Sequence, residues 1–487
     1  MLINFIFIFI LSFLARLIFV IFFPETGGDY EIYSTVAKNI LRGCGVSLSD
    51  PMSSECVPHF GGNHGPGYDV FIASIWYLFD HSNNAIRVIQ TLIYSSFCIY
   101  LLVAIKTHIN NKKFLTFFGI ILSLSPLLIA WPRYVQTETL AIAFTLFLIA
   151  ELLLSLKDKK IRVVSIALAL ILATWIRLDN IFLTIPVAVC CFYLHGVKKG
   201  LLKGFLIAFL LSLSWGMWTT RNIIVKLPSL LPTNMIMPDG SRSPTGYLNW
   251  TKTWITHEYE KPGSLWGINR KNYANILIPE YAYFDINEKI KVEKLISKLK
   301  KLDGLPFPKE IDDEFKQVAE IKKNKYPIKY WMQNPVKRIY KMWSNPFSSF
   351  GWPNEIPSGG LSHSERLYVA KGNFNILLLK IKKYPYRSIS KGANAFYKFT
   401  LFLLYMYSLF FIFIKNETKV LQFFGYISLS YLLGRTIFFS INGIFETRYI
   451  VTVLPFMELF VAVCFFEKYY KKIDKFSSKL KTEKQSK

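Results

Sequence analysis

The stretch ETLAIAFTLFLIAELLLSLKDKKIRVVSIALALILATWIRLDN, residues 138–180, decides the fold. It contains two apolar runs, residues 138–156 and 162–176, joined by a short connection rich in lysine. Runs approaching 20 apolar residues have the length that a membrane-spanning helix needs. Lysine and arginine accumulate in cytoplasmic connections. The stretch therefore predicts a helical hairpin in a membrane, with the lysines inside and Arg177 and Asp179 outside.

The same pattern extends over the whole chain of 487 residues, of which 52% are hydrophobic and 16% aromatic, with a mean hydropathy of +0.30. Helices are the expected spanning form because backbone polar groups must be satisfied within the lipid, and the alternating ten-residue units of a barrel are absent from the sequence. We expect an α-helical polytopic membrane protein with about ten transmembrane helices. The expected spans are 2–23, 85–105, 114–131, 138–156, 162–176, 180–195, 204–222, 396–414, 420–440 and 448–467.

The connections after the second, fourth, sixth and eighth spans, and the tail after Phe466, are rich in lysine. The positive-inside rule makes that face cytoplasmic, so both termini are expected inside. Leu2–Phe23 is too long for a signal-peptide core and is expected to stay as the first helix. This topology also explains the net charge of +26, and since no recognition motif accompanies the charge, we expect no nucleic-acid partner.

The spans divide the chain into four parts. Residues 1–222 form an N-terminal transmembrane module, whose first outer loop, 24–84, contains an amphipathic helix at Tyr30–Leu41 and a short apolar stretch at Tyr68–Phe79 that is interfacial or packed into the bundle. Residues 223–395 are long enough for a small mixed outer domain, with helical runs near Glu288–Leu302 and Pro335–Trp343. Residues 396–467 supply the last helices, and 468–487 form a basic cytoplasmic tail that suits anionic lipid headgroups.

Two of the six cysteines, Cys44 and Cys56, lie together in the first outer loop. An oxidising exterior permits a disulfide between them, but sequence does not give their separation. The other four lie in expected spans and are interpreted as ordinary apolar residues.

The expected outer face collects polar residues from several loops. Asp29 and Glu31 follow the first span, where Asp29 is either a helix cap or a carboxylate that serves as general base or metal ligand. His64, in a Gly- and Pro-rich turn before Tyr68, is either a solvated loop residue or part of the site. Glu138 opens the fourth span, where a negative charge also favours a helix N-terminus.

Arginines accompany these groups at the same face. Arg177 follows the fifth span and could simply pair with Asp179, and Arg221 closes the seventh. Glu446 and Arg448 precede the last helix, in which Pro455 lies. Three further charges lie within spans, where charge usually faces a bundle interior or a cavity: Arg16, Arg435 and Glu458. Arg16 and Arg435 either snorkel outward or bind a lipid phosphate.

In the order of these elements the chain resembles the GT-C glycosyltransferases, particularly the branch of protein O-mannosyltransferases and the bacterial aminoarabinose transferase. The likeness is closest over the N-terminal 222 residues. The matching elements, in chain order, are Asp29 with nearby Glu31, His64-Gly65-Pro66-Gly67-Tyr68, Glu138, the Leu-x-Arg elements, Trp218-x-x-Arg221-Asn222, Asn334-Pro335 and Glu446-x-Arg448-Tyr449. The chain departs from the family at Asn63-His64-Gly65, where a second proline is usual, and in having Tyr30 between its two acids.

The resemblance implies transfer of a sugar from a polyprenyl-phosphate donor to a glycolipid, glycan or protein acceptor on the extracytoplasmic face. It makes Asp29 the catalytic base, gives Glu138 a role in placing the acceptor or a divalent metal ion, and assigns Arg177, Arg435 and Arg448 to the donor phosphate. The remaining substrate-binding candidates are Glu31, His64, Tyr68, Arg221 and Glu446.

Two other functions fit a helical bundle with charged helix ends. A transporter or flippase of lipid-linked sugars would show internal repeats and broken helices, and no repeat is evident in the sequence. A polysaccharide polymerase or ligase would differ mainly in using a longer lipid-linked glycan as donor.

Overall fold

The structure is a computed structural model, and it describes residues 2–59, 65–227, 243–269, 271–345, 350–353, 373–414, 418–443 and 446–470. These residues are overwhelmingly helical, and no strand is formed among them. Six helical segments have the length and apolar composition to cross a membrane: Asn4–Phe22, Asn83–Lys106, Glu138–Asp158, Leu178–Ile224, Pro385–Ile412 and Lys419–Asn442. The protein is therefore a helical membrane protein.

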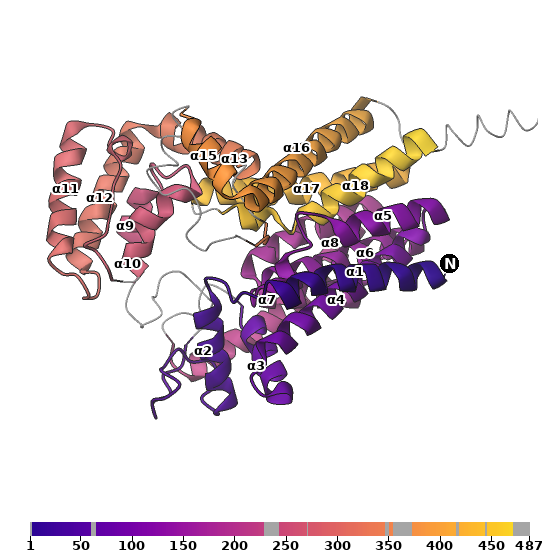
Figure 1. The fold of residues 1–487 in the computed structure, drawn as a ribbon, viewed down its shortest axis with the longest axis horizontal. Helices are drawn as coiled ribbons and strands as arrows, with labels where there is room; N and C mark the ends of the chain where they lie inside the picture. The colour runs from indigo at the N-terminus through magenta and orange to yellow at the C-terminus, as the bar shows by residue number, and fades with distance from the viewer. Residues whose placement is uncertain are drawn as a thin grey trace, which may run out of the picture.

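One large hydrophobic core holds the bundle together, and residues from both ends of the chain contribute to it. Figure 1 shows the bundle helices running side by side, with the N-terminus and the end of α18 on the right and helices α9 to α12 beyond the opposite end. The bundle helices are α1 (Leu2–Phe22), α4 (Asn83–Lys106), α5 (Lys112–Leu124), α6 (Glu138–Asp158), α7 (Val163–Ile176), α8 (Thr184–Ile224), α16 (Pro385–Ile414), α17 (Lys419–Asn442) and α18 (Leu454–Phe465).

Helix α8 is two helical segments that meet at Gly196, whose φ of 66° is non-helical. A Cβ placed on Gly200 would lie 2.9 Å from the carbonyl oxygen of Cys191. Nine residues of continuous helix would separate these positions by about 13 Å. The chain therefore turns back at Gly196, which is where the sequence places a connection between two spans.

Helix α5 ends at Leu124, although the sequence predicts a span to residue 131. Ser125 precedes Pro126 and takes an extended conformation (ψ 116°), because a proline disfavours helical geometry at the residue before it. Arg16 satisfies the freed helix end by donating to the carbonyl oxygens of Leu122 (3.2 Å) and Ser123 (2.8 Å). Arg16 is fully buried, so of the two alternatives that the sequence left open for it, outward snorkelling is wrong.

The last helix also starts later than predicted. A short 3₁₀ turn, η7 (Thr447–Ile450), leads into α18 (Leu454–Phe465), which has Pro455 in its first turn. Proline suits that position because the amide it lacks would have no helical partner there. The first residues of the expected span 448–467 are therefore not α-helical, and they lie on the side where α17 ends.

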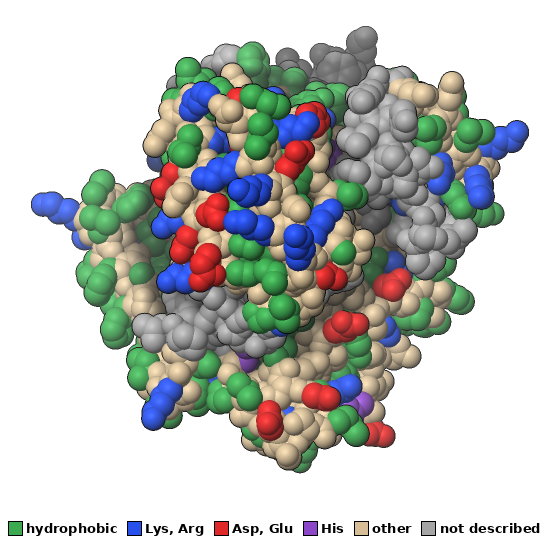
Figure 2. Space-filling model, turned by 90° about the vertical axis from the view of Figure 1, so that its left-hand side faces the viewer, with side chains coloured by type: hydrophobic (Ala, Val, Ile, Leu, Met, Phe, Trp, Pro, Cys, Tyr) green, Lys and Arg blue, Asp and Glu red, His purple; other side chains and the backbone are tan. Residues whose placement is uncertain are grey.

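A second, smaller hydrophobic core lies beyond that end of the bundle. It is formed mainly by α9 (Thr245–Thr251), α11 (Ile286–Lys300) and α12 (Lys309–Lys325). It contains a buried ion pair: Glu288 accepts from Trp250 Nε1 (2.9 Å) and from Lys322 Nζ (2.6 Å). Figure 2, which faces this end, shows basic and acidic side chains interspersed over its upper part, a surface typical of water-exposed helices.

Helix α13 (Asn334–Ser344) joins the second core to the bundle, because it packs against α17. Its Arg338 is 1% exposed and donates to the carbonyl oxygens of Ile255 and Ser440, each at 2.8 Å. Asn334 donates to the carbonyl oxygen of Thr253 at 2.6 Å. The helical run predicted at Pro335–Trp343 is therefore correct, and its role is to fix the second core on the end of α17.

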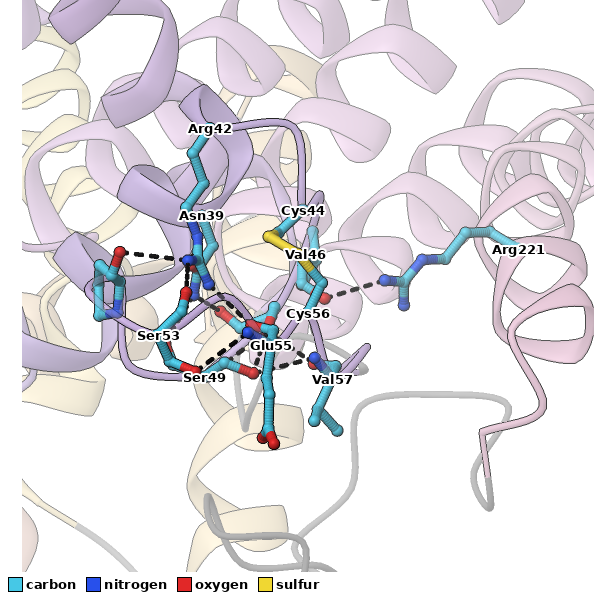
Figure 3. The surroundings of a disulfide bond; sticks show 12 residues. Asn39, Arg42, Cys44, Val46, Ser49, Ser53, Glu55, Cys56, Val57 and Arg221 are labelled. Atoms are coloured by element: carbon cyan, nitrogen blue, oxygen red, sulfur yellow. Dashed lines mark hydrogen bonds between the residues drawn. A yellow bond between two sulfur atoms is a disulfide. The ribbon is translucent and has the colours of Figure 1, made fainter.

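The segment between α1 and α4 forms the two helices that the sequence predicts, α2 (Tyr30–Leu41) and α3 (Gly67–Phe79), which pack against each other. Between them Cys44 and Cys56 form a disulfide, with Cα atoms 5.2 Å apart. Figure 3 shows Arg42 beside this bond, and its guanidinium donates to the carbonyl oxygens of Pro51, Ser53 and Glu55. The bond and the arginine together hold this part of the segment in one shape.

Candidate functional site

Five segments that are distant in sequence bring charged side chains together at the end of the bundle nearest the second core. They are the start of α2, the start of α6, the 3₁₀ turn η2 (Leu178–Leu183) with the residue before it, the last turns of α17, and η7. Each is a helix end, where backbone groups are unsatisfied and the chain leaves the apolar core. The site is therefore built at the boundary between the bundle and its polar surroundings.

The charged side chains form one connected series of ion pairs. Arg448 Nη1 lies 2.9 Å from Asp29 Oδ2 and 3.5 Å from Glu138 Oε1. Arg177 Nη1 lies 2.7 Å from the same Glu138 oxygen, and its Nε lies 3.1 Å from Asp179 Oδ1. The series thus runs from Asp29 through Arg448, Glu138 and Arg177 to Asp179.

Two further cations extend the series. Arg435 Nη2 lies 2.6 Å from Asp179 Oδ2. Near Asp29 the series branches: Arg448 Nε lies 2.6 Å from Glu446 Oε2, and Lys261 Nζ lies 3.5 Å from Glu446 Oε1. Four carboxylates and four cations therefore balance, so an arriving anion must compete with a carboxylate for its cation.

Asp29 occupies the position before α2, but its side chain makes no capping hydrogen bond. It is directed instead to Arg448, and its side chain remains 27% exposed. Gly27 makes this placement possible: its φ is +89°, and a Cβ there would lie 2.3 Å from the side chain of Gln136. The interpretation of Asp29 as a simple cap is therefore wrong.

Glu138 begins α6 and is 1% exposed. One oxygen is shared by Arg177 and Arg448, while Oε2 is buried without a hydrogen-bond partner in the part of the chain that the structure describes. A buried unpaired acceptor is costly. Glu138 Oε2 is therefore available to a donor group that a substrate would bring.

The surroundings shift the proton affinities of the groups around the site. Burial lowers the pKa of Arg177, but Asp179 and Glu138 outweigh it and raise that pKa above its ordinary value. Burial raises the pKa of Glu446, but Arg448 and Lys261 outweigh it and lower that pKa. Burial, Asp29 and Glu138 raise the pKa of Tyr33 well above its ordinary value, so this phenol stays protonated at neutral pH.

The sequence did not identify Lys261 as a site residue. It is 4% exposed and comes from the turn between η3 (Glu258–Glu260) and η4 (Pro262–Trp266), beside the second core. Burial lowers the pKa of Lys261, and Glu446 partly offsets this. Nothing in the local sequence marks this lysine among many others, because only the packing of the second core brings it to Glu446.

Arg435 is also buried, which rules out the alternative that it snorkels outward. It donates to the carbonyl oxygen of Tyr449 at 2.6 Å and to the hydroxyl of Tyr431 at 3.1 Å, besides its pair with Asp179. These contacts tie α17 to η2 and η7. Arg435 therefore fixes the position of Asp179 rather than reaching toward solvent.

The remaining candidates are not members of the ion-pair series. Tyr68 is fully buried, with its ring 5.0 Å from that of Tyr33, and Glu31 is exposed on α2. Arg221 donates to the carbonyl oxygens of His59 (2.6 Å) and Val46 (2.9 Å), so it anchors the disulfide-bonded segment (Figure 3). His64 lies outside the described residues.

The carboxylates of Asp29 and Glu138 are arranged around an arginine. Within the described residues, no group of three or more His, Cys, Asp or Glu side chains is placed to hold a metal ion. The space between Asp29 and Glu138, which a metal would need, contains the guanidinium of Arg448. The cation that these two carboxylates share is therefore an arginine.

Comparison with known proteins identifies no relative: no family model, no curated protein and no solved structure matches this chain.

Proposed function

We propose that this protein is an integral membrane glycosyltransferase that moves a sugar from a polyprenyl-phosphate donor to a glycolipid, glycan or protein acceptor. The observation that carries the proposal is the placement of the half-buried Asp29 carboxylate against Arg448, within a cluster of cations at one end of an apolar bundle. A lipid-linked sugar phosphate has this polarity, since its chain belongs in the bilayer and its phosphate needs cations.

The chemistry requires two things from the chain. A carboxylate must accept the proton of the acceptor hydroxyl, and cations must stabilise the charge that develops on the departing phosphate. Asp29 supplies the first, and Arg448, with Arg177 and Lys261 behind it, supplies the second. The acceptor oxygen forms a bond to the anomeric carbon while the bond between that carbon and the phosphate oxygen breaks. The lipid phosphate leaves with the electron pair, and the configuration at the anomeric carbon is inverted.

The ion pair between Asp29 and Arg448 requires the donor to bind before Asp29 can accept the proton of the acceptor. While Arg448 is paired with Asp29, the carboxylate is a poor base because the positive charge stabilises its ionised form. A donor phosphate competes for Arg448 and weakens that pair. Asp29 then faces the acceptor with greater proton affinity, and Glu138 Oε2 accepts a hydrogen bond from a substrate hydroxyl.

The orientation of the chain is part of the same proposal. The lysine-rich connections support a cytoplasmic location for the N-terminus and the end of α18, and the charged site and the second core are then on the extracytoplasmic face. With α8 counted as two crossings and the short helices α5, α7 and α18 included, the proposed path has ten crossings. A plasma membrane, the inner one in a cell with two, fits a cell-envelope glycosylation enzyme.

One observation favours a transporter of lipid-linked sugars instead. The helices α5, α7 and α18 are shorter than a full membrane span, and helices that line transport sites are also broken within the membrane. However, the non-helical segments that follow α5 and α7 and precede α18 all lie toward the end of the bundle that holds the charged site. A transport site would be expected near the midplane and accessible from both sides.

The test is sugar transfer by the purified full chain in proteoliposomes, with a panel of synthetic polyprenyl-phosphate sugars and a cell-envelope extract as acceptor. Labelled product in the acceptor fraction is the expected result. The transporter account predicts labelled lipid crossing the vesicle membrane with no labelled product from any donor.

A further inference from the structure

The bundle contains an apolar crevice of about 620 Å³, far along the helices from the charged site. Helix α18 forms its floor, and α5 and α16 form its two sides. The side chains that line it include Phe117 and Ile121 from α5, Leu401 and Leu404 from α16, and Ala462 and Phe465 from α18. The volume lies within the range of ligand-binding pockets, about 300–1,000 Å³.

The two ends of the crevice differ in chemistry. One end is closed by Glu458, whose Oε1 accepts hydrogen bonds from Ser125 (2.6 Å) and Tyr397 (3.0 Å). The other end is bordered by Lys113, in the first turn of α5. Lys113 is exposed, and no carboxylate pairs with it among the described residues.

A second cation lies near the Lys113 end. Lys468 follows Phe466, which lines the crevice, and its ammonium lies 3.4 Å from the centroid of the Phe411 ring. Its nitrogen also contacts the hydroxyl of Tyr407, one turn beyond Leu404 on α16. Lys113 thus lines the mouth of an almost entirely apolar space, and Lys468 lies two residues beyond another lining residue, Phe466, with its ammonium against α16.

The surroundings of the crevice show where its occupant comes from. The faces of α5 and α16 beside it expose apolar side chains, with Phe117 61% exposed and Phe410 58% exposed. In a membrane protein such faces contact lipid chains. An occupant therefore enters sideways from the bilayer, and its polar end stays at the lysines.

We propose that this crevice binds one acyl chain of an anionic phospholipid, with the lipid phosphate held between Lys113 and Lys468. An apolar space between membrane helices with lysines at its mouth matches the chemistry of such a lipid, since basic pockets between helices bind anionic headgroups. The site is separate from the charged cluster at Asp29, which lies at the other end of the helices. The lipid fills the gap between α5 and α16 and so joins the N-terminal and C-terminal helices.

The test is native mass spectrometry of the delipidated full chain, to which phosphatidylglycerol or phosphatidylcholine with identical chains is added. Wild type is expected to bind one phosphatidylglycerol with about tenfold preference, a factor that corresponds to one charge-assisted contact. The double variant Lys113→Ala/Lys468→Ala is expected to lose the preference. Lys112→Ala, an adjacent exposed lysine that does not line the crevice, is the matched control and should behave as wild type.

The position of the lipid's acyl chain in the crevice is tested separately. Ala462→Trp fills the crevice, and Phe117→Trp narrows its mouth at an exposed position that folding tolerates. Both are expected to lower the occupancy of phosphatidylglycerol at least severalfold. Equal binding of both lipids by wild type, loss of preference in Lys112→Ala, or full occupancy in the folded tryptophan variants would overturn the proposal.

Discussion

Nη1 of Arg448 lies 2.9 Å from Oδ2 of Asp29, a residue 419 positions earlier in the chain. The same nitrogen lies 3.5 Å from Glu138. The two carboxylates to which the family resemblance assigns catalytic roles therefore share one arginine from the other end of the chain. The N-terminal helices are incomplete as a site until the C-terminal helices pack against them.

The buried centre of the ion-pair series should dominate its contribution to stability. Arg177→Gln removes one of the two arginine partners of both Glu138 and Asp179, and breaking a buried pair costs about 3–5 kcal/mol. Lys289→Gln removes a pair of the same length, 2.7 Å, in which Glu280 is 76% exposed, and exposed pairs contribute little to stability. The free energy of unfolding in detergent should separate the two variants. Similar losses would contradict the burial argument.

Lys261 should act on donor binding, because it adds positive charge beside Arg448 from outside the bundle. We expect Lys261→Met to raise KM for the donor about tenfold, which corresponds to one charge-assisted contact of roughly 1.4 kcal/mol, and to change kcat little. Lys261→Arg should recover most of the loss. Lys289→Met serves as the control for a lysine of the second core. A fall in kcat at unchanged KM would show that Lys261 acts at another step.

His59 should make stability depend on pH. Burial and the nearby Arg221 lower the pKa of its imidazole from 6.5 to about 4. The unfolded chain therefore binds a proton at this histidine in the window between these values while the folded chain does not, so this group lowers stability as pH falls from about 6.5 to about 4. Thermal unfolding of His59→Gln should lack this part of the pH dependence. His81→Gln, at an exposed imidazole, should keep it, and identical profiles for wild type and His59→Gln would contradict the prediction.

Sugar transfer should survive chelation of divalent metal ions. The guanidinium of Arg448 lies between Asp29 and Glu138, so the site has its shared cation already. Activity in excess EDTA is expected to stay within about twofold of the untreated enzyme, a change of under 0.5 kcal/mol in the barrier. Loss of activity that Mg²⁺ or Mn²⁺ restores would show that a metal ion takes the place of Arg448.

Much of this architecture could be predicted from local sequence. Apolar length and lysine-rich connections located the bundle helices. An amphipathic pattern located α2, and a short apolar stretch located α3, close to their observed bounds. The expected topology puts every second connection between spans on the same face of the membrane. That assignment predicted that six charged residues would lie together: Asp29, Glu138, Arg177, Arg435, Glu446 and Arg448. Helix ends that meet at one face of a bundle bring their flanking residues together.

The failures have a common physical origin in packing between distant segments. The early end of α5 depends on Pro126 and on Arg16, which reaches across from α1 to bind the freed carbonyl oxygens. Lys261 reaches the site only because α13 fixes the second core against α17 through Arg338. The burial of Arg435 likewise requires Asp179 from another segment. Such contacts leave no local period or motif in the sequence.

The most direct test of the central claim is the rate of sugar transfer by Asp29→Asn, compared with wild type and Glu31→Gln at saturating donor. Asparagine keeps the shape of the side chain but cannot accept the proton, and Glu31 is an exposed acid two residues away. The account predicts a loss of at least about a hundredfold in kcat for Asp29→Asn, the scale of general-base catalysis, with Glu31→Gln close to wild type. Wild-type kcat in a folded Asp29→Asn variant would contradict it.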